Sequence, residues 1–260
     1  PRGTTMRAKR TWAARHVDHV RRALTPEPRG HRDMLAAVLT EPTSSEAHAG
    51  VLFMSADGWE PLSGHGAMGV TAMALDRGTI VPAGGGRSLT LDTVGGCVRV
   101  VVEPARPGVA GFHVQFENVP AFVLHGGAVA ALASRRVRVD IAFAGSFHAV
   151  VDSEALGIPL DGAHLPELRR AAAEIVRAVN ATIPVAHPVD IDATEVERVV
   201  FTGPARYDGA ARRVVMVTAA GRVDPSPSVT GMSAVMAIVD AMGLLDDEQP
   251  FVCEGLGGTL

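Results

Sequence analysis

The 260-residue sequence is poor in two kinds of residue that mark common protein classes. Its two cysteines, Cys97 and Cys253, are too few for a disulfide framework, and neither has a Cys or His neighbour at metal-ligand spacing. We therefore expect no structural metal, and we expect reduced thiols that both pack in the core of a cytoplasmic protein. Aromatic residues make up only 4% of the chain, so Val, Leu, Ala and Met must fill that core.

The sequence also lacks an excess of positive charge and any long apolar run. Its 24 Lys and Arg residues against 28 Asp and Glu residues give a formal net charge of −4, so there is no basic footprint. No apolar run approaches the roughly 20 residues that span a bilayer. Nucleic acid and membranes are therefore not expected partners.

One sequence pattern occurs twice in the chain. Residues 63–80 read SGHGAMGVTAMALDRGTI, and residues 228–245 read SVTGMSAVMAIVDAMGLL. Aligned without a gap, the two share five positions: Ser63/Ser228, Gly66/Gly231, Val70/Val235, Ala72/Ala237 and Gly78/Gly243. Each copy is a Ser, two residues, a Gly, an apolar run with helical character and a Gly at which the helix is predicted to end. A repeated pattern of this kind predicts repeated architecture.

The two predicted helices carry almost no charge, so we expect them to be buried all round. The first turn of a helix presents backbone N–H groups and the positive end of the helix dipole. Two such ends can hold one anion, such as a carboxylate. Ser63 and Ser228 would then flank the bound molecule, although a Ser in this position is also the usual N-cap of a helix.

The remaining segments alternate between short strands and a few helices. We expect helices at 5–25 and 165–180, and strands at 35–40, 50–54, 88–93, 97–103, 112–116, 121–124, 137–143, 145–152, 196–202 and 213–218. Gly95-Gly96 predicts a tight hairpin, and the PAGGGRS segment after residue 80 predicts a turn. This pattern predicts an α/β (α+β) fold of two lobes, each a curved, mostly antiparallel sheet around a central buried helix.

We expect residues 1–105, together with the C-terminal segment 246–260, to form the first lobe. Residues 106–245 would form the second lobe, and the site is expected to lie between the two.

Several segments in the same order along the chain resemble the proline racemase family. They are TMRAKR, HVDHVRRAL, EPRGHRDM, AVLTEP, AHAGVLFM, SGHGAMGV, VVFTGPAR, VDPSPSVTGMSA and PFVCEGLGGT. The family includes hydroxyproline 2-epimerases and trans-3-hydroxy-L-proline dehydratases. The resemblance implies two pseudo-symmetric lobes of the diaminopimelate-epimerase type, a small-molecule substrate (proline or a hydroxyproline) and no pyridoxal or other cofactor. It leaves open whether the protein is a homodimer.

The resemblance also implies which residues form the site. Racemases of the family carry one catalytic Cys before a Gly-His-Gly segment and another after Asp-Arg-Ser-Pro, and these positions are Ser63 and Ser228 here. His65 and Asp224 are their polar neighbours, and Pro225 replaces the family's Arg. Substrate contacts are expected from six residues: Gly64, Gly66, Val229, Thr230, Gly231 and His148.

The two serines change the expected chemistry. A Ser hydroxyl is a far weaker acid than a thiol and needs an adjacent base, whereas a His ionises near neutral pH. We therefore expect the proton to pass to His65 or Asp224, with the serines as relays or hydrogen-bond donors. His65 could instead be a structural histidine, and Asp224 could serve the turn in which it lies.

Three functions follow from this pattern. The first is racemisation or 2-epimerisation at the α-carbon of proline or a hydroxyproline. The second is dehydration of trans-3-hydroxy-L-proline, which needs one base at the α-carbon, and family dehydratases have Thr at the second Cys position. The third is an inactive homologue that binds an amino acid. A serine hydrolase is not expected, because the chain has no G-x-S-x-G elbow around either Ser.

Overall fold

The structure is a computed structural model that describes residues 1–80, 87–104, 112–224, 226–246 and 248–260. The chain divides into two compact units, Pro1–Val119 and Pro120–Leu260. The boundary therefore falls later than the expected one near residue 105, because residues 112–117 pair with the first sheet. The C-terminal segment also belongs to the second unit rather than the first, because its strand pairs there.

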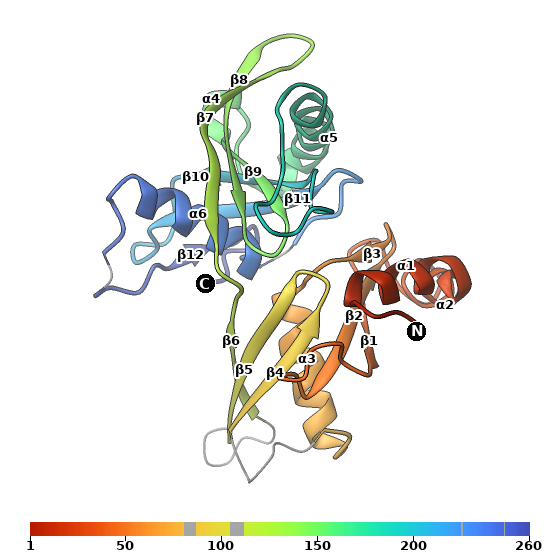
Figure 1. Ribbon diagram of the computed structural model, residues 1–260. Helices are drawn as coiled ribbons and strands as arrows, with labels where there is room; N and C mark the ends of the chain where they lie inside the picture. The colour runs from red at the N-terminus through yellow and green to blue at the C-terminus, as the bar shows by residue number, and fades with distance from the viewer. Residues whose placement is uncertain (81–86, 105–111, 225, 247) are drawn as a thin grey trace. The chain divides into compact units, whose positions relative to one another are not determined.

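The first unit holds a mixed sheet and three helices within its described residues (Figure 1). Its elements are α1 (Met6–His16), α2 (Asp18–Leu24), β1 (Leu35–Thr40), β2 (Ala49–Ser55), β3 (Trp59–Glu60), α3 (Gly64–Asp76), β4 (Ser88–Thr93), β5 (Gly96–Pro104) and β6 (Phe112–Glu117). The sheet has the order β1-β2-β4-β5-β6, with β3 paired to β2, and its neighbours are antiparallel except for the parallel pair β2 and β4. The hairpin expected at Gly95-Gly96 joins β4 and β5, and the PAGGGRS turn lies largely outside the described residues.

Helices cover both faces of strand β2. Leu52 packs with Met6 and Ala13 of α1, whereas its neighbour Phe53 lies against Gly66 of α3. Successive side chains of a strand point to opposite faces, so α1 and α3 lie on opposite sides of the sheet. This arrangement explains why all seven residues of β2 are buried.

The predicted helix at 5–25 is two helices, which is a correction. Thr5 caps α1 by accepting a hydrogen bond from the N–H of Ala8, and the chain leaves helical geometry at Val17. Asp18 then accepts hydrogen bonds from Trp59 of β3 and from Arg21. Arg21 also donates to the carbonyls of Ser55 and Ala56, so contacts with the sheet fix the start and direction of α2.

The second unit holds the other sheet. Its elements are β7 (Phe122–Ala131), β8 (Arg136–Phe143), β9 (Phe147–Asp152), α4 (Ser153–Leu156), a 3₁₀ turn (Gly162–His164), α5 (Leu165–Thr182), β10 (Val196–Gly203), β11 (Arg212–Thr218), α6 (Val229–Ala241) and β12 (Cys253–Glu254). The strand order is β12-β11-β10-β9-β8-β7, with parallel pairs at β9/β10 and β11/β12 and antiparallel pairs elsewhere. Two register irregularities in β7 bend this strand, which gives the sheet curvature.

Helices α5 and α6 lie on opposite sides of this sheet, as Figure 1 shows. Val200 of β10 packs with Ala234 and Val235 of α6 in a cluster that small side chains such as Ala142 keep compact. The amphipathic helix α5 buries Leu168, Ile175 and four further residues. The fold is therefore α/β with two mostly antiparallel sheets, each packed against a helix from one copy of the repeated pattern.

The repeated pattern produces two helices of the same length. Both α3 and α6 have 13 residues, and each is followed by a glycine with a positive φ, 64° at Gly78 and 69° at Gly243. At both ends the glycine N–H and the next N–H bond back to carbonyls of the last turn, which is the Schellman motif. The helix ends predicted from the two glycines are confirmed.

Two expectations about burial are wrong. Helices α3 and α6 each expose one face, with Met73 of α3 44% exposed and Asp240 of α6 exposed, because each sheet covers only the other side of its helix. Cys97 is exposed on β5, since the alternate residues Val98 and Val100 take the buried positions, whereas Cys253 is buried as expected. Burial raises the pKa of the Cys253 thiol to about 11.

Candidate active site

The N-terminus of α3 is organised by Ser63. This residue has extended geometry, with φ −144° and ψ 119°, and its Oγ accepts a hydrogen bond of 3.2 Å from the N–H of Gly66. The Ser63 side chain is half-buried, and His65, in the first turn, is exposed. A hydroxyl and an imidazole therefore lie within two residues of the positive end of a helix.

Gly66 allows this helix end to approach the sheet closely. A Cβ added at Gly66 would lie 2.7 Å from Cε1 of Phe53 and 2.8 Å from Cδ2 of Leu35. Phe53 is fully buried, so it has no room to move away. Helix-to-sheet packing therefore requires glycine at residue 66.

The N-terminus of α6 repeats this arrangement in a more buried setting. The Oγ of Ser228 accepts a hydrogen bond of 3.4 Å from the N–H of Gly231, as Ser63 does from Gly66. The hydroxyls of Ser228 and Thr230 are also hydrogen-bonded to each other at 3.2 Å. Ser228 is 4% exposed and Thr230 is 2% exposed. Val229, between them, is half-buried.

Asp224 is held by an ion pair that the sequence analysis did not anticipate. Its Oδ1 accepts a hydrogen bond of 3.1 Å from Nη1 of Arg222, whose side chain is 4% exposed. The Arg-Val-Asp order of residues 222–224 is a sequence signal for this ion pair, because residues two apart in an extended segment lie on the same face. Val223, between them, forms a bridge with Val217, so the segment is extended. Pro225 lies outside the described residues.

His148 lies inside the second sheet. It pairs with Ala142 on one side and Arg198 on the other, and its side chain is fully buried. Its Nδ1 donates to the carbonyl of Ser146 at 2.9 Å. Burial, with the nearby charge of Arg198, lowers the pKa of His148 to about 3, so the ring is neutral at pH 7. The expected substrate contact is therefore not supported, because no atom of this side chain reaches the surface.

Two further features bear on what the site can hold. No cluster of three or more potential metal-ligating side chains occurs among the described residues. In the same part of the chain, no helix combines the length and apolar character required to cross a bilayer.

Comparison with known proteins identifies the family. A sequence profile described as Proline racemase matches residues 1–260. The chain belongs to the proline racemase family. It is 33% identical over 253 residues to a trans-3-hydroxy-L-proline dehydratase of Bacillus cereus, a match that covers 97% of this chain and 75% of the relative. It is 34% identical over 265 residues to a 4-hydroxyproline 2-epimerase of Streptosporangium roseum, covering 99% and 77% of the two chains.

A solved structure supports the same assignment. The hydroxyproline epimerase of Agrobacterium vitis, determined with bound trans-4-hydroxy-L-proline, has a TM-score of 0.85 and 28% identity to this chain. The match covers 99% of this chain and 75% of the epimerase. The family fold expected from the quoted segments is therefore confirmed.

Proposed function

We propose that this protein abstracts the α-proton of proline or a hydroxyproline without a cofactor, and that it acts as a racemase or 2-epimerase. The observation that carries the proposal is the pair of serine-capped helix N-termini, built alike on α3 and α6. Family membership supplies the chemistry, since relatives named as epimerase and dehydratase act on hydroxyprolines. The proposal places Ser63 and Ser228 in the same reaction.

The first helix end supplies the base. A Ser hydroxyl needs a neighbouring base to accept a proton at neutral pH, and histidine is the side chain best suited to that task. His65 is exposed in the first turn of α3, two residues after Ser63. We assign proton removal to His65, with Ser63 as the hydrogen-bonding relay between the α-carbon and the imidazole.

The second helix end supplies the proton donor. Ser228 is buried, and its hydroxyl bonds to Thr230 and to the N–H of Gly231. In an epimerase this hydroxyl passes a proton to the opposite face of the α-carbon as it takes one up from water, and His65 releases the abstracted proton to solvent. The substrate carboxylate is held by N–H groups at the helix ends, around Gly64 and Val229, because such groups favour anions.

Dehydration of trans-3-hydroxy-L-proline is the second candidate, and the Asp224–Arg222 ion pair favours it. Nη1 of Arg222 donates to Oδ1 of Asp224 at 3.1 Å, so this ion pair occupies a carboxylate oxygen that would otherwise be available to the substrate. The α6 end then has hydroxyls but no strong acid. Elimination needs a single base at the α-carbon, so it is less affected by this than a two-base inversion.

The test measures products from wild-type protein and from H65Q, S63A and S228A, with L-proline, trans-4-hydroxy-L-proline and trans-3-hydroxy-L-proline as substrates. The proposal predicts D-proline or the 2-epimer from wild type, and a loss of at least 100-fold in H65Q, which is the usual scale for a general base. S233A is the matched control for S228A, because Ser233 lies on the same helix and bonds to the carbonyl of Val229.

The outcomes separate the candidates. Loss of the 3-hydroxyl group from trans-3-hydroxy-L-proline, with no inversion of L-proline, would show that the reaction is dehydration and not epimerisation. Wild-type activity in H65Q would remove His65 from the mechanism. Binding of the substrates with no turnover in wild type would leave an inactive homologue. Since an N-cap contributes about 1 kcal/mol, the folding of S63A and S228A is measured in parallel.

A further inference from the structure

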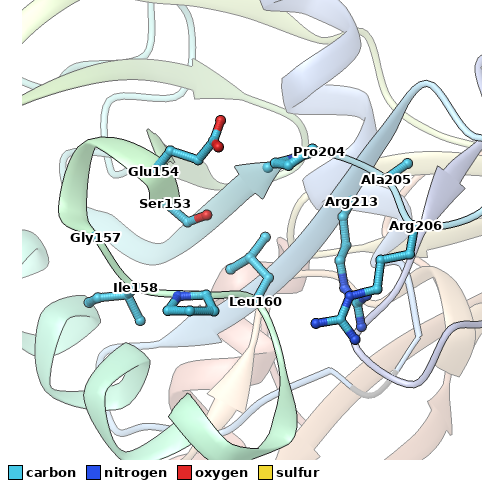
Figure 2. Close-up of a pocket in the computed structure, with 11 residues that line it drawn as sticks. Ser153, Glu154, Gly157, Ile158, Leu160, Pro204, Ala205, Arg206 and Arg213 are labelled. Atoms are coloured by element: carbon cyan, nitrogen blue, oxygen red, sulfur yellow. The ribbon is translucent and has the colours of Figure 1, made fainter.

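The second unit contains a cavity that the proposed reaction does not use. It has a volume of about 500 Å³, which lies within the range of small-molecule pockets. It is formed at the end of β9 and β10, by α4, the loop after α4 and the loop after β10 (Figure 2). Neither Ser63 nor Ser228 lines it.

The walls of the cavity are mostly apolar. Ile158, Pro159 and Leu160 form one side, and Pro204 lies on the loop after β10. The polar groups in the lining include the hydroxyl of the buried Ser153 and the side chains of Arg206 and Arg213. An apolar wall with a few polar groups is the usual composition of a site for an organic ligand.

Arg213 contributes a buried hydrogen-bond donor without an acceptor. Its side chain is 4% exposed, with Nη1 donating to Oε1 of Glu254 at 2.9 Å and Nη2 to the carbonyl of Leu256 at 2.6 Å. Its Nε, in contrast, has no hydrogen-bond partner among the residues that the structure describes. This Nε is itself buried, so Arg213 contributes a fixed guanidinium beside the cavity rather than a hydrogen bond into it.

Glu254 organises both arginines. Its Oε2 accepts hydrogen bonds from the backbone N–H groups of Arg206 and Tyr207, while its Oε1 pairs with Arg213. Burial alone would raise the pKa of Glu254, but these N–H donors and the charge of Arg213 lower it. The carboxylate is therefore an anion that fixes the backbone at Arg206 and the guanidinium of Arg213.

Arg206 supplies the accessible positive charge. Its side chain is 62% exposed, and Nη2 has a loose contact of 3.6 Å with Oδ2 of Asp161. Figure 2 shows the Arg206 and Arg213 side chains on the same side of the cavity, away from Glu154. The cavity thus has an apolar part and a cationic end. Because Asp161 lies beside Arg206 and Glu254 pairs with Arg213, little positive charge is left over at this end. A ligand with a single negative charge therefore fits it better than a phosphate dianion does.

We propose that this cavity is a second ligand site, which binds a small monocarboxylate with an apolar body. The carboxylate accepts hydrogen bonds from the guanidinium of Arg206, beside the buried Arg213, and the apolar body lies against Ile158, Leu160 and Pro204. The site is separate from the α-carbon chemistry proposed above and does not depend on it.

Isothermal titration with 3-phenylpropionate, and with the neutral 3-phenylpropanamide, tests this proposal. We expect saturable one-to-one binding of the acid and at least tenfold weaker binding of the amide. R206Q should weaken binding of the acid about tenfold, a factor in the range of one charge-assisted hydrogen bond. R212Q is the matched control, because Arg212 is an exposed neighbour that does not line the cavity, and it should bind like wild type.

Binding is then located by NMR on labelled protein. Shifts at Ser153, Leu160 and Gly203 are expected, with turnover of any proline substrate unchanged in R206Q. Three results would overturn the proposal. They are an equal loss of affinity for the acid in R206Q and R212Q, chemical-shift changes confined to the residues around Ser63 and Ser228, and a titration that does not saturate at millimolar acid. Failure of the proposed reaction would leave these binding results unaffected, so the two proposals fail separately.

Discussion

His148 gives the protein a pH-dependent stability that can be calculated from its surroundings. The ring is fully buried, bonds to the carbonyl of Ser146 through Nδ1, and lies beside Arg198 on the neighbouring strand. Burial and this charge lower its pKa from 6.5 to about 3. In the unfolded chain the ring is hydrated and takes up a proton near pH 6.5.

The sign of the effect follows from proton binding. Between pH 6.5 and about 3 the unfolded chain binds one more proton at this residue than the folded protein does, so stability rises with pH across this window. Each pH unit within it contributes about 1.4 kcal/mol. Integration from pH 8 to pH 5 gives a loss of about 2 kcal/mol attributable to His148 alone.

Urea unfolding at pH 8 and pH 5, on wild type and H148N, measures this contribution. The asparagine amide can keep the hydrogen bond to Ser146 but cannot titrate, so the loss of stability between the two pH values should be about 2 kcal/mol smaller in H148N. H19N, at an exposed histidine of α2, is the control and should retain the wild-type loss. If H148N loses as much unfolding free energy between pH 8 and pH 5 as wild type does, the reasoning is refuted, whatever the stability of the variant at pH 8.

Two further predictions concern packing and the buried ion pair. G66A should lower the free energy of unfolding by about 1–3 kcal/mol because the added methyl meets Phe53 at 2.7 Å, whereas G231A, with its nearest contact at 3.3 Å, should change it by less than about 1 kcal/mol. Equal effects in urea unfolding would contradict this difference between the two repeats. E254Q should cost about 3–5 kcal/mol at pH 7 because it leaves Arg213 buried without its counter-ion. The pKa of Glu254 is lower in the folded protein than its unfolded value near 4.5. The stability that its carboxylate contributes is therefore present above about pH 4.5 and is lost as the pH falls through the folded pKa. The loss of stability caused by E254Q should accordingly become smaller in acid.

Much of the fold could be predicted from local patterns. The strands at 35–40 and 88–93 match β1 and β4, because turn residues bound each run. The ends of α3 and α6 follow from the serine N-caps and from glycines that adopt a positive φ. These features depend on a few adjacent residues, which is why a single sequence reveals them.

Features set by distant contacts could not be predicted. The break at Val17 carries no Gly or Pro, and it follows from the contact of Asp18 with Trp59, 41 residues away. The place of residues 253–254 depends on their pairing with β11, and the ion pair of Glu254 with Arg213 spans the same long separation. Local composition carries no record of such pairings.

The candidate site was predicted unevenly for the same reason. Ser63 and Ser228 were found because their pattern repeats, and both cap helices as expected. His148 was a misleading candidate, because strand alternation and two neighbouring strands bury it. The pairing of Asp224 with Arg222 bears on the reaction, yet the sequence analysis considered Asp224 alone.

The most direct test of the central claim is proton NMR of the purified protein in D2O with L-proline, trans-4-hydroxy-L-proline and trans-3-hydroxy-L-proline. The account predicts loss of the α-proton signal of at least one substrate, by exchange with solvent deuterium or by elimination. Retention of all three α-proton signals, in samples where line broadening shows that the substrates bind, would contradict it.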